Sequence, residues 1–194
     1  MRATLRQTLA GLRLLLALTV LLGILYPLAV AGLARALPAR ADGSLVTDTA
    51  GTVVGSRLLA QAVDGDAWFH PRPSAGGYDP LASGGTNLGP ENPDLLAQVE
   101  GRRAEVARRE GVEPARVPAD AVTASASGLD PDISPEYARL QVARVAAERG
   151  LAEDDVAALV EERVRGRTLG FIGAPSVNVL ELNLALAAMD PAGG

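Results

Sequence analysis

The feature that most constrains this chain is an uncharged apolar run of 21 residues, from Leu14 to Ala34. As a helix, this run spans about 31 Å, which matches the hydrocarbon core of a bilayer. It is apolar on every face, whereas a helix in the core of a small domain keeps a polar stripe. Pro27 removes one backbone donor and predicts a kink. The run therefore predicts a helix that spans a membrane.

This run is compatible with two fates, a permanent anchor and a cleaved signal peptide. The triplet Ala39-Arg40-Ala41 has the small-x-small pattern of a signal cleavage site. The apolar core of a signal peptide is usually about 7–15 residues long, so the run from Leu14 to Ala34 favours the anchor. The alternative is an exported binding protein or hydrolase that is released after Ala41.

Charge divides the chain and predicts its orientation. Arg2, Arg6 and Arg13 precede the apolar run, and no acid accompanies them. Basic residues favour the cytoplasmic side, so the N-terminus is expected in the cytoplasm and the bulk of the chain outside the cytoplasmic membrane, which it crosses once. Residues 35–194 hold the other 15 arginines and all 23 acids, a net charge of −8. The expected parts are a basic terminus (1–13), a span (14–34), a tether (35–43) and an extracytoplasmic domain (44–194).

Composition excludes several kinds of chemistry. The chain has no cysteine, no lysine and one histidine, His70. These absences exclude disulfides, thiolate metal sites, Schiff-base catalysis, a Walker-A phosphate loop and a multi-histidine metal site. An acidic net charge gives no support for nucleic-acid binding. We therefore expect no intrinsic metal or cofactor and no nucleic-acid partner.

The pattern beyond the tether predicts an α+β domain that is rich in helix, with a short sheet and one long ordered loop. Asn92-Pro93 and Ser134-Pro135 combine a good N-cap with proline at the first helical position. Asn178 with Glu181 forms a capping box, and Gly111 and Gly150 are typical helix stops. The expected strands are 45–48, 53–59 and 121–124, the loop is 61–92, and the expected helices are 92–110, 134–150, 153–165 and 178–189.

The loop holds three of the six phenylalanine, tryptophan and tyrosine residues and the only histidine. Disordered segments are poor in aromatics, so we expect an ordered loop that Trp68 and Phe69 pin in place. His70 with Ser74 or Ser83 and Asp79 could compose a hydrolase triad, but no nucleophile-elbow motif supports it. A lone histidine beside aromatics is more typical of a structural hydrogen bond. The run from Ser83 to Asn87 is typical of a turn and is also compatible with an anion-binding nest.

Three segments resemble the KdpC family, the C subunits of the bacterial high-affinity potassium-transporting ATPase. They are Trp68–Pro93 (WFHPRPSAGGYDPLASGGTNLGPENP), Val122–Ser134 (VTASASGLDPDIS) and Gly170–Leu184 (GFIGAPSVNVLELNL). The Tyr-Pro pair inside the apolar run also fits the family. Two positions depart from its usual pattern, because Ala126 stands for a glycine and Asp132 for a histidine.

The resemblance implies a non-catalytic subunit of a four-part membrane complex. The other members are a channel-like potassium-conducting subunit, a P-type ATPase subunit and a small peptide subunit. The family is described as a catalytic chaperone that raises the ATP affinity of the ATPase subunit in a ternary complex, and Gln141 is the matching candidate for a nucleotide contact. Aromatic anchors are common binding hot spots, which makes the loop the expected contact with partners. The candidate partner contacts are Trp68, Phe69, His70, Tyr78, Ser83, Gly84, Asn87, Ser127 and Asp130.

Overall fold

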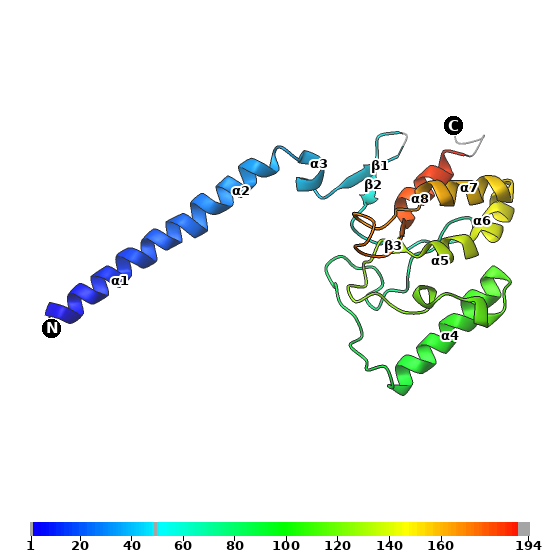
Figure 1. Cartoon of the computed structure of the whole chain (residues 1–194), viewed down its shortest axis with the longest axis horizontal. Coiled ribbons are helices and arrows are strands. Elements are labelled where there is room, and N and C mark those ends of the chain that lie inside the picture. Colours follow the sequence, from blue (N-terminus) through cyan, green and yellow to red (C-terminus); the bar gives the residue numbers. More distant parts are fainter. Residues whose placement is uncertain (1, 49, 190–194) are drawn as a thin grey trace. The chain divides into compact units, whose positions relative to one another are not determined.

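The computed structural model describes residues 2–48 and 50–189 of the chain. It consists of two compact units, Met1–Ser44 and Leu45–Gly194 (Figure 1).

The first unit is dominated by one continuous helix. Three labelled elements compose it, α1 (Arg2–Val20), the π-helical turn η1 (Leu21–Leu25) and α2 (Tyr26–Ala34). The wider π turn lies directly before Pro27, where the missing N–H breaks the ordinary α-helical pattern. No residue of the helix is buried within the described chain, and its length of 33 residues and its hydropathy suit a membrane span. A short helix, α3 (Pro38–Ala41), follows.

The second unit begins with a β-hairpin of β1 (Leu45–Thr47) and β2 (Val53–Ser56). The strands are antiparallel, with a bulge between Val46 and Thr47. The Asp48 carboxylate closes the turn by accepting hydrogen bonds from the amides of Ala50 (2.9 Å) and Thr52 (2.8 Å). Both expected strands are present, although the second ends earlier than residue 59.

Short strands and helices make up the rest of the unit, and the α+β expectation is confirmed (Figure 1). The only other strand pair in the described residues joins β3 (Asp132–Ile133) and β4 (Val177–Asn178), which lie about 45 positions apart in sequence and pair antiparallel. The elements are α4 (Pro93–Glu110), η2 (Pro114–Arg116), η3 (Ala119–Ala121), β3 (Asp132–Ile133), α5 (Pro135–Leu140), α6 (Val142–Arg149), α7 (Glu153–Arg163), β4 (Val177–Asn178) and α8 (Val179–Ala187).

The predicted N-caps form the expected bonds. Asn92, Ser134 and Asn178 each accept a backbone N–H of the first turn that follows, at 2.8, 3.0 and 3.1 Å. Gly111 and Gly150 end α4 and α6 in the left-handed conformation. These signals act within a few residues, which is why the sequence reveals them.

Two expectations about the elements are wrong. Residues 121–124 form no strand, because η3 turns the chain there and the Ala119 carbonyl accepts from the amides of Val122 and Thr123 instead. The helix expected over 134–150 is interrupted at Gln141, where α5 ends and α6 begins.

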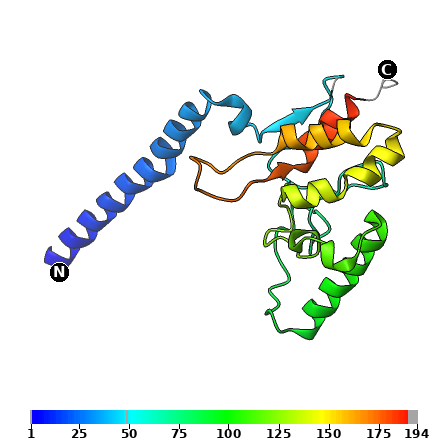
Figure 2. The same cartoon turned by 45° about the vertical axis from the view of Figure 1, so that its right-hand side comes forward.

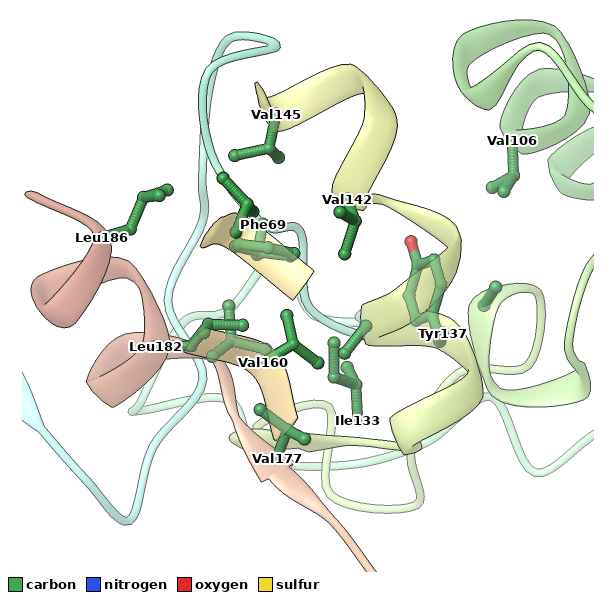
Figure 3. Packing of buried hydrophobic residues seen from close by; sticks show 14 of the residues in the cluster. Phe69, Val106, Ile133, Tyr137, Val142, Val145, Val160, Val177, Leu182 and Leu186 are labelled. Carbon is green, nitrogen blue, oxygen red and sulfur yellow. The ribbon is translucent and has the colours of Figure 1, made fainter. Parts of the chain in front are cut away.

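The core of the second unit lies between α5, α6, α7 and α8 and consists mainly of valine, leucine and alanine. Phe69 is the aromatic centre of this core and is fully buried. Figure 3 shows it among Val142 and Val145 of α6 and Leu182 and Leu186 of α8. The aromatic thus comes from the loop, so folding of the helices and ordering of the loop are coupled.

Candidate partner-binding site

The long loop is fixed at its aromatic segment by two side-chain amides. Asn183 of α8 accepts a hydrogen bond from the Phe69 amide and donates one to the Phe69 carbonyl, both at 2.9 Å. Gln141 accepts from the His70 amide at 2.7 Å and donates to the His70 carbonyl at 3.1 Å. Each carboxamide therefore pairs with the loop as a neighbouring strand would.

The segment before Phe69 is held by arginines of α6. Arg144 donates to the carbonyl oxygens of Trp68 (3.0 Å) and Asp66. The Arg149 guanidinium lies 4.4 Å from the centre of the Trp68 ring, a cation–π contact. Trp68 is partly buried against the core, so its ring is pinned to the domain as expected.

A buried ionic network holds Arg144, the arginine that binds the segment before Phe69. The Glu110 carboxylate is fully buried and accepts from Arg109 at 3.0 Å and from Arg144 at 3.1 and 3.0 Å. Arg109 also donates to the Tyr137 hydroxyl at 3.3 Å. Burial raises the pKa of that hydroxyl to about 12, so Tyr137 stays protonated at neutral pH. The two arginines compensate the negative charge of the buried carboxylate. Because Arg144 belongs to α6, the ion pair also fixes α4 against α6.

His70 is neutral in this setting. Burial lowers its pKa below the ordinary 6.5, and the nearby charges of Arg109 and Arg144 lower this pKa further. The Nε2 atom lies 3.0 Å from the Gly65 carbonyl oxygen, which can only accept, so Nε2 carries the proton.

No hydrolase triad forms among the described residues. The hydroxyl of Ser74 accepts from the Tyr78 and Gly76 amides, and the Ser83 hydroxyl donates to the Ser127 carbonyl. The Asp79 carboxylate accepts from the Leu81 amide. The ring of His70 therefore has neither a serine nor a carboxylate partner, and the hydrolase alternative is not favoured.

The second half of the loop packs against the segment around Ser127. Gly84 donates to the Ser127 carbonyl at 2.8 Å. Gly128 has a φ of +68°, and a Cβ there would lie 3.0 Å from the Gly84 oxygen, so only glycine permits this approach. Arg72 pairs with Asp130 at 2.9 Å. Two of the segments that carry the family resemblance thus meet in space.

A polar cleft of about 290 Å³ opens beside the fixed loop. Its lining combines loop residues with residues of α4, and two arginines give it cationic groups. Within the described residues, no group of three or more histidine or acidic residues is placed to hold a metal ion. The lining residues are Ala62, Val63, Asp64, His70, Pro71, Pro73, Tyr78, Arg102, Glu105, Val106, Arg109, Ala121 and Tyr137.

The candidate contacts fall into two groups. Phe69 and Gln141 are fully buried, and both polar atoms of the Gln141 amide are engaged by the loop or Arg144. In this conformation they position the loop and present no free surface. Ser83, Gly84, Asn87 and Ser127 are exposed, whereas Trp68, His70, Tyr78 and Asp130 are partly exposed.

The sequence alone missed the residues that organise the site. Asn183 was assigned only to a helix, and Arg144, Arg149 and Glu110 were assigned to no site. The sequence does contain an indication for Glu110. An acid in the last turn of a helix interacts unfavourably with the helix dipole, so a cationic partner is expected beside it. The pairing of Asn183 with Phe69, 114 positions away, leaves no local trace.

Comparison with known proteins decides the family. A family profile described as "KdpC: K+-transporting ATPase, c chain" matches residues 8–188. The chain belongs to the KdpC family. It is 61% identical over 189 residues to the potassium-transporting ATPase KdpC subunit of Kineococcus radiotolerans, with 96% of each chain covered.

Other KdpC relatives are similar over nearly their whole length. The KdpC subunit of Caulobacter sp. strain K31 is 54% identical over 179 residues, covering 91% of this chain and 90% of that one. The KdpC subunit of Geobacter sulfurreducens is 47% identical over 182 residues, covering 92% and 95%. The family assignment makes the chain an accessory subunit of the potassium-transporting ATPase. Its lack of lysine excludes the Asp-Lys-Thr-Gly phosphorylation motif of the P-type subunit.

Proposed function

We propose that this KdpC-type subunit assembles and stabilises an ATP-driven potassium-uptake complex by docking the face that carries the cleft onto a partner subunit. The expected partners are the channel-like potassium-conducting subunit, the P-type ATPase subunit and the small peptide subunit. The observation that carries the proposal is the fixed loop, whose Phe69 and His70 backbone groups are held by buried carboxamides. A surface that is ordered in advance loses little entropy on binding.

The docking test is a charge reversal in the cleft. Arg102→Glu places an acid among the cleft-lining residues, and Arg108→Glu makes the same change at an exposed position of the same helix. After both variants are shown to unfold at the same temperature, the whole complex is copurified from membranes. Arginine hot spots are worth about 2 kcal/mol or more, so Arg102→Glu should lower recovery of the other subunits roughly tenfold or more. Equal recovery with both variants would overturn the docking face.

We also propose that the second unit lies outside the cytoplasm. The three arginines before the apolar run support this orientation. Single cysteines are introduced at Thr4 and Ser127 of the cysteine-free chain, and intact cells are treated with a membrane-impermeant thiol reagent. Labelling at Ser127 alone supports the orientation, whereas labelling at Thr4 alone reverses it.

The role in ATP affinity stays a prediction from the family resemblance, with Gln141 as the candidate contact. Gln141 belongs to the second unit, so direct contact with cytoplasmic ATP requires the orientation opposite to the one proposed above, and the two proposals are alternatives. The matched pair Gln141→Ala and Asn183→Ala separates direct contact from loop positioning, because each removes one of the two carboxamides that hold the loop. The readout is the KM for ATP of the assembled complex. An increase in KM with Gln141→Ala alone supports ATP contact. Equal changes with both variants assign Gln141 to loop positioning.

A further inference from the structure

Outside the long loop 61–92, the most exposed apolar side chains of the second unit lie at the turn in the middle of the segment between α7 and β4. Leu169, Phe171 and Ile172 expose 79%, 70% and 51% of their surface. Figure 2 shows this segment projecting from the helices of its unit as a long loop. A projecting cluster of three large apolar side chains is costly in water and indicates an interaction site.

The apolar tip is held in a defined turn. Thr168 and Ile172 exchange two backbone hydrogen bonds of 2.9 Å, and Arg165 and Ser176 form a second pair nearer the base, at 2.8 and 3.0 Å. Leu169 adopts a left-handed φ of +53°, which is unfavourable for a leucine. Backbone strain of this kind persists only where the surrounding structure enforces it, and here the two pairs of backbone hydrogen bonds hold the turn.

The charge of this segment is opposite to that of its unit. Residues 164–176 contain Arg165 and Arg167 and no acid, although residues 35–194 together carry a net charge of −8. Arg165 is paired with Asp132 at 2.6 Å. Arg167 has no ion pair with any described residue. A cation beside an apolar tip complements the anionic headgroups of a bilayer.

The length of the connection limits how far the second unit can lie from the membrane. The helix that suits a membrane span ends at Ala34, and the second unit begins at Leu45. The ten residues between them extend at most about 35 Å. The second unit is therefore always within reach of the lipid surface.

We propose that Leu169, Phe171 and Ile172 insert into the headgroup region of the bilayer, with Arg167 contacting anionic lipid phosphates. Interfacial side chains of this kind enter about 5–10 Å, to the boundary of the acyl chains, and need no shape-matched pocket. The contact gives the second unit a second attachment besides its helix and fixes its orientation on the membrane. It uses none of the residues of the polar cleft, so it stands or falls independently of the docking proposal.

The test places an environment-sensitive fluorophore at the tip of the full chain in vesicles. Phe171→Cys is labelled with NBD, and Leu81→Cys is the control, because Leu81 is 95% exposed in a different loop. The vesicles contain phosphatidylcholine with or without phosphatidylglycerol, together with a nitroxide-labelled lipid as quencher. We expect the Phe171 label to emit at shorter wavelength and to be quenched about twofold more than the Leu81 label. Adding Arg167→Glu should reduce the difference only in the phosphatidylglycerol vesicles.

Two results would overturn the proposal. One is equal emission and equal quenching of the Phe171 and Leu81 labels in both kinds of vesicle. The other is shielding of Phe171 from water that begins only when the other ATPase subunits are added, without lipid quenching, because the tip then occupies a protein groove. Thermal unfolding of the labelled chains confirms that each variant is folded.

Discussion

Two buried carboxamides, Gln141 and Asn183, give the aromatic loop the backbone partners that a strand would otherwise supply. A buried N–H or C=O without a partner costs about 1–3 kcal/mol, so a loop that enters the core needs such partners. Phe69 could be predicted to pin the loop, but its position at the centre of the core could not. That position depends on contacts with helices more than 70 residues away along the chain.

Removal of one carboxamide should destabilise the second unit strongly. Asn183→Ala leaves the amide and the carbonyl of Phe69 buried without partners, and we expect a loss of about 2–4 kcal/mol in the free energy of unfolding. Gln98→Ala is the control, since Gln98 is exposed and makes only a 3.4 Å bond to Arg102. Denaturant unfolding measures both variants. A loss below about 1 kcal/mol for Asn183→Ala would contradict the role given to it.

His70 predicts how the stability of the second unit changes with pH. The pKa of His70 is lowered in the folded state, so the unfolded chain binds more protons in the window just below pH 6.5. Stability from this group is present above pH 6.5 and is lost as the pH falls through 6.5 toward the folded-state pKa. His70→Gln should remove this part of the pH dependence, which unfolding measurements between pH 7 and 5 would detect. A histidine NMR titration with a midpoint at or above 6.5 in the folded protein would contradict the assignment.

At the scale of elements, local signals were predictable and tertiary ones were not. The caps at Asn92, Ser134 and Asn178 act on the next turn, so the starts of their helices were predicted correctly. The interruption at Gln141 depends on a partner 71 positions away, and the pairing of β3 with β4 joins distant segments. Strands of two residues are too short to show the alternation of apolar and polar side chains by which strands are recognised in a sequence.

Asp132 holds the segment between α7 and β4 in place. Its carboxylate accepts from Arg165 at 2.6 Å and from Ser176 and Asn178 at 3.2 Å, which joins β3 to both ends of the segment between α7 and β4. The carboxylate thereby forms an ion pair with Arg165 at the start of that segment.

Asp132→Ala should loosen this segment while the core remains folded. We expect the amides of Thr168 and Ile172 to exchange hydrogen about tenfold faster, because local opening of the turn becomes easier. Amides in α7 should keep their protection. Asp154→Ala, at the exposed first turn of α7, is the control. Unchanged exchange at Thr168 and Ile172 would show that the turn holds itself without Asp132.

At the scale of the whole molecule, the composition and the apolar helix favour a membrane-bound subunit. A lysine-free, cysteine-free chain with one span-length helix was predictable as an accessory membrane subunit, and family membership supports that assignment. The net charge of −8 on residues 35–194 suggests a modest rise in local cation concentration, which salt screens within about 8 Å. The charge alone could not indicate which surface meets a partner, because that surface is formed by the packing of the loop on the helices.

The division into two units predicts that the second folds without the first. Every residue of the buried hydrophobic cluster lies at or beyond position 69, so the apolar helix contributes nothing to that core. With a protease site inserted after Ala41, cleavage in detergent should leave the melting temperature of the second unit within about 2 °C of the intact value. Its binding to the other ATPase subunits should weaken by roughly 100-fold or more, because tethering through the membrane no longer raises its local concentration. A large fall in melting temperature on cleavage would mean that the helix stabilises the domain. Binding that persists undiminished would mean that the second unit alone supplies the affinity.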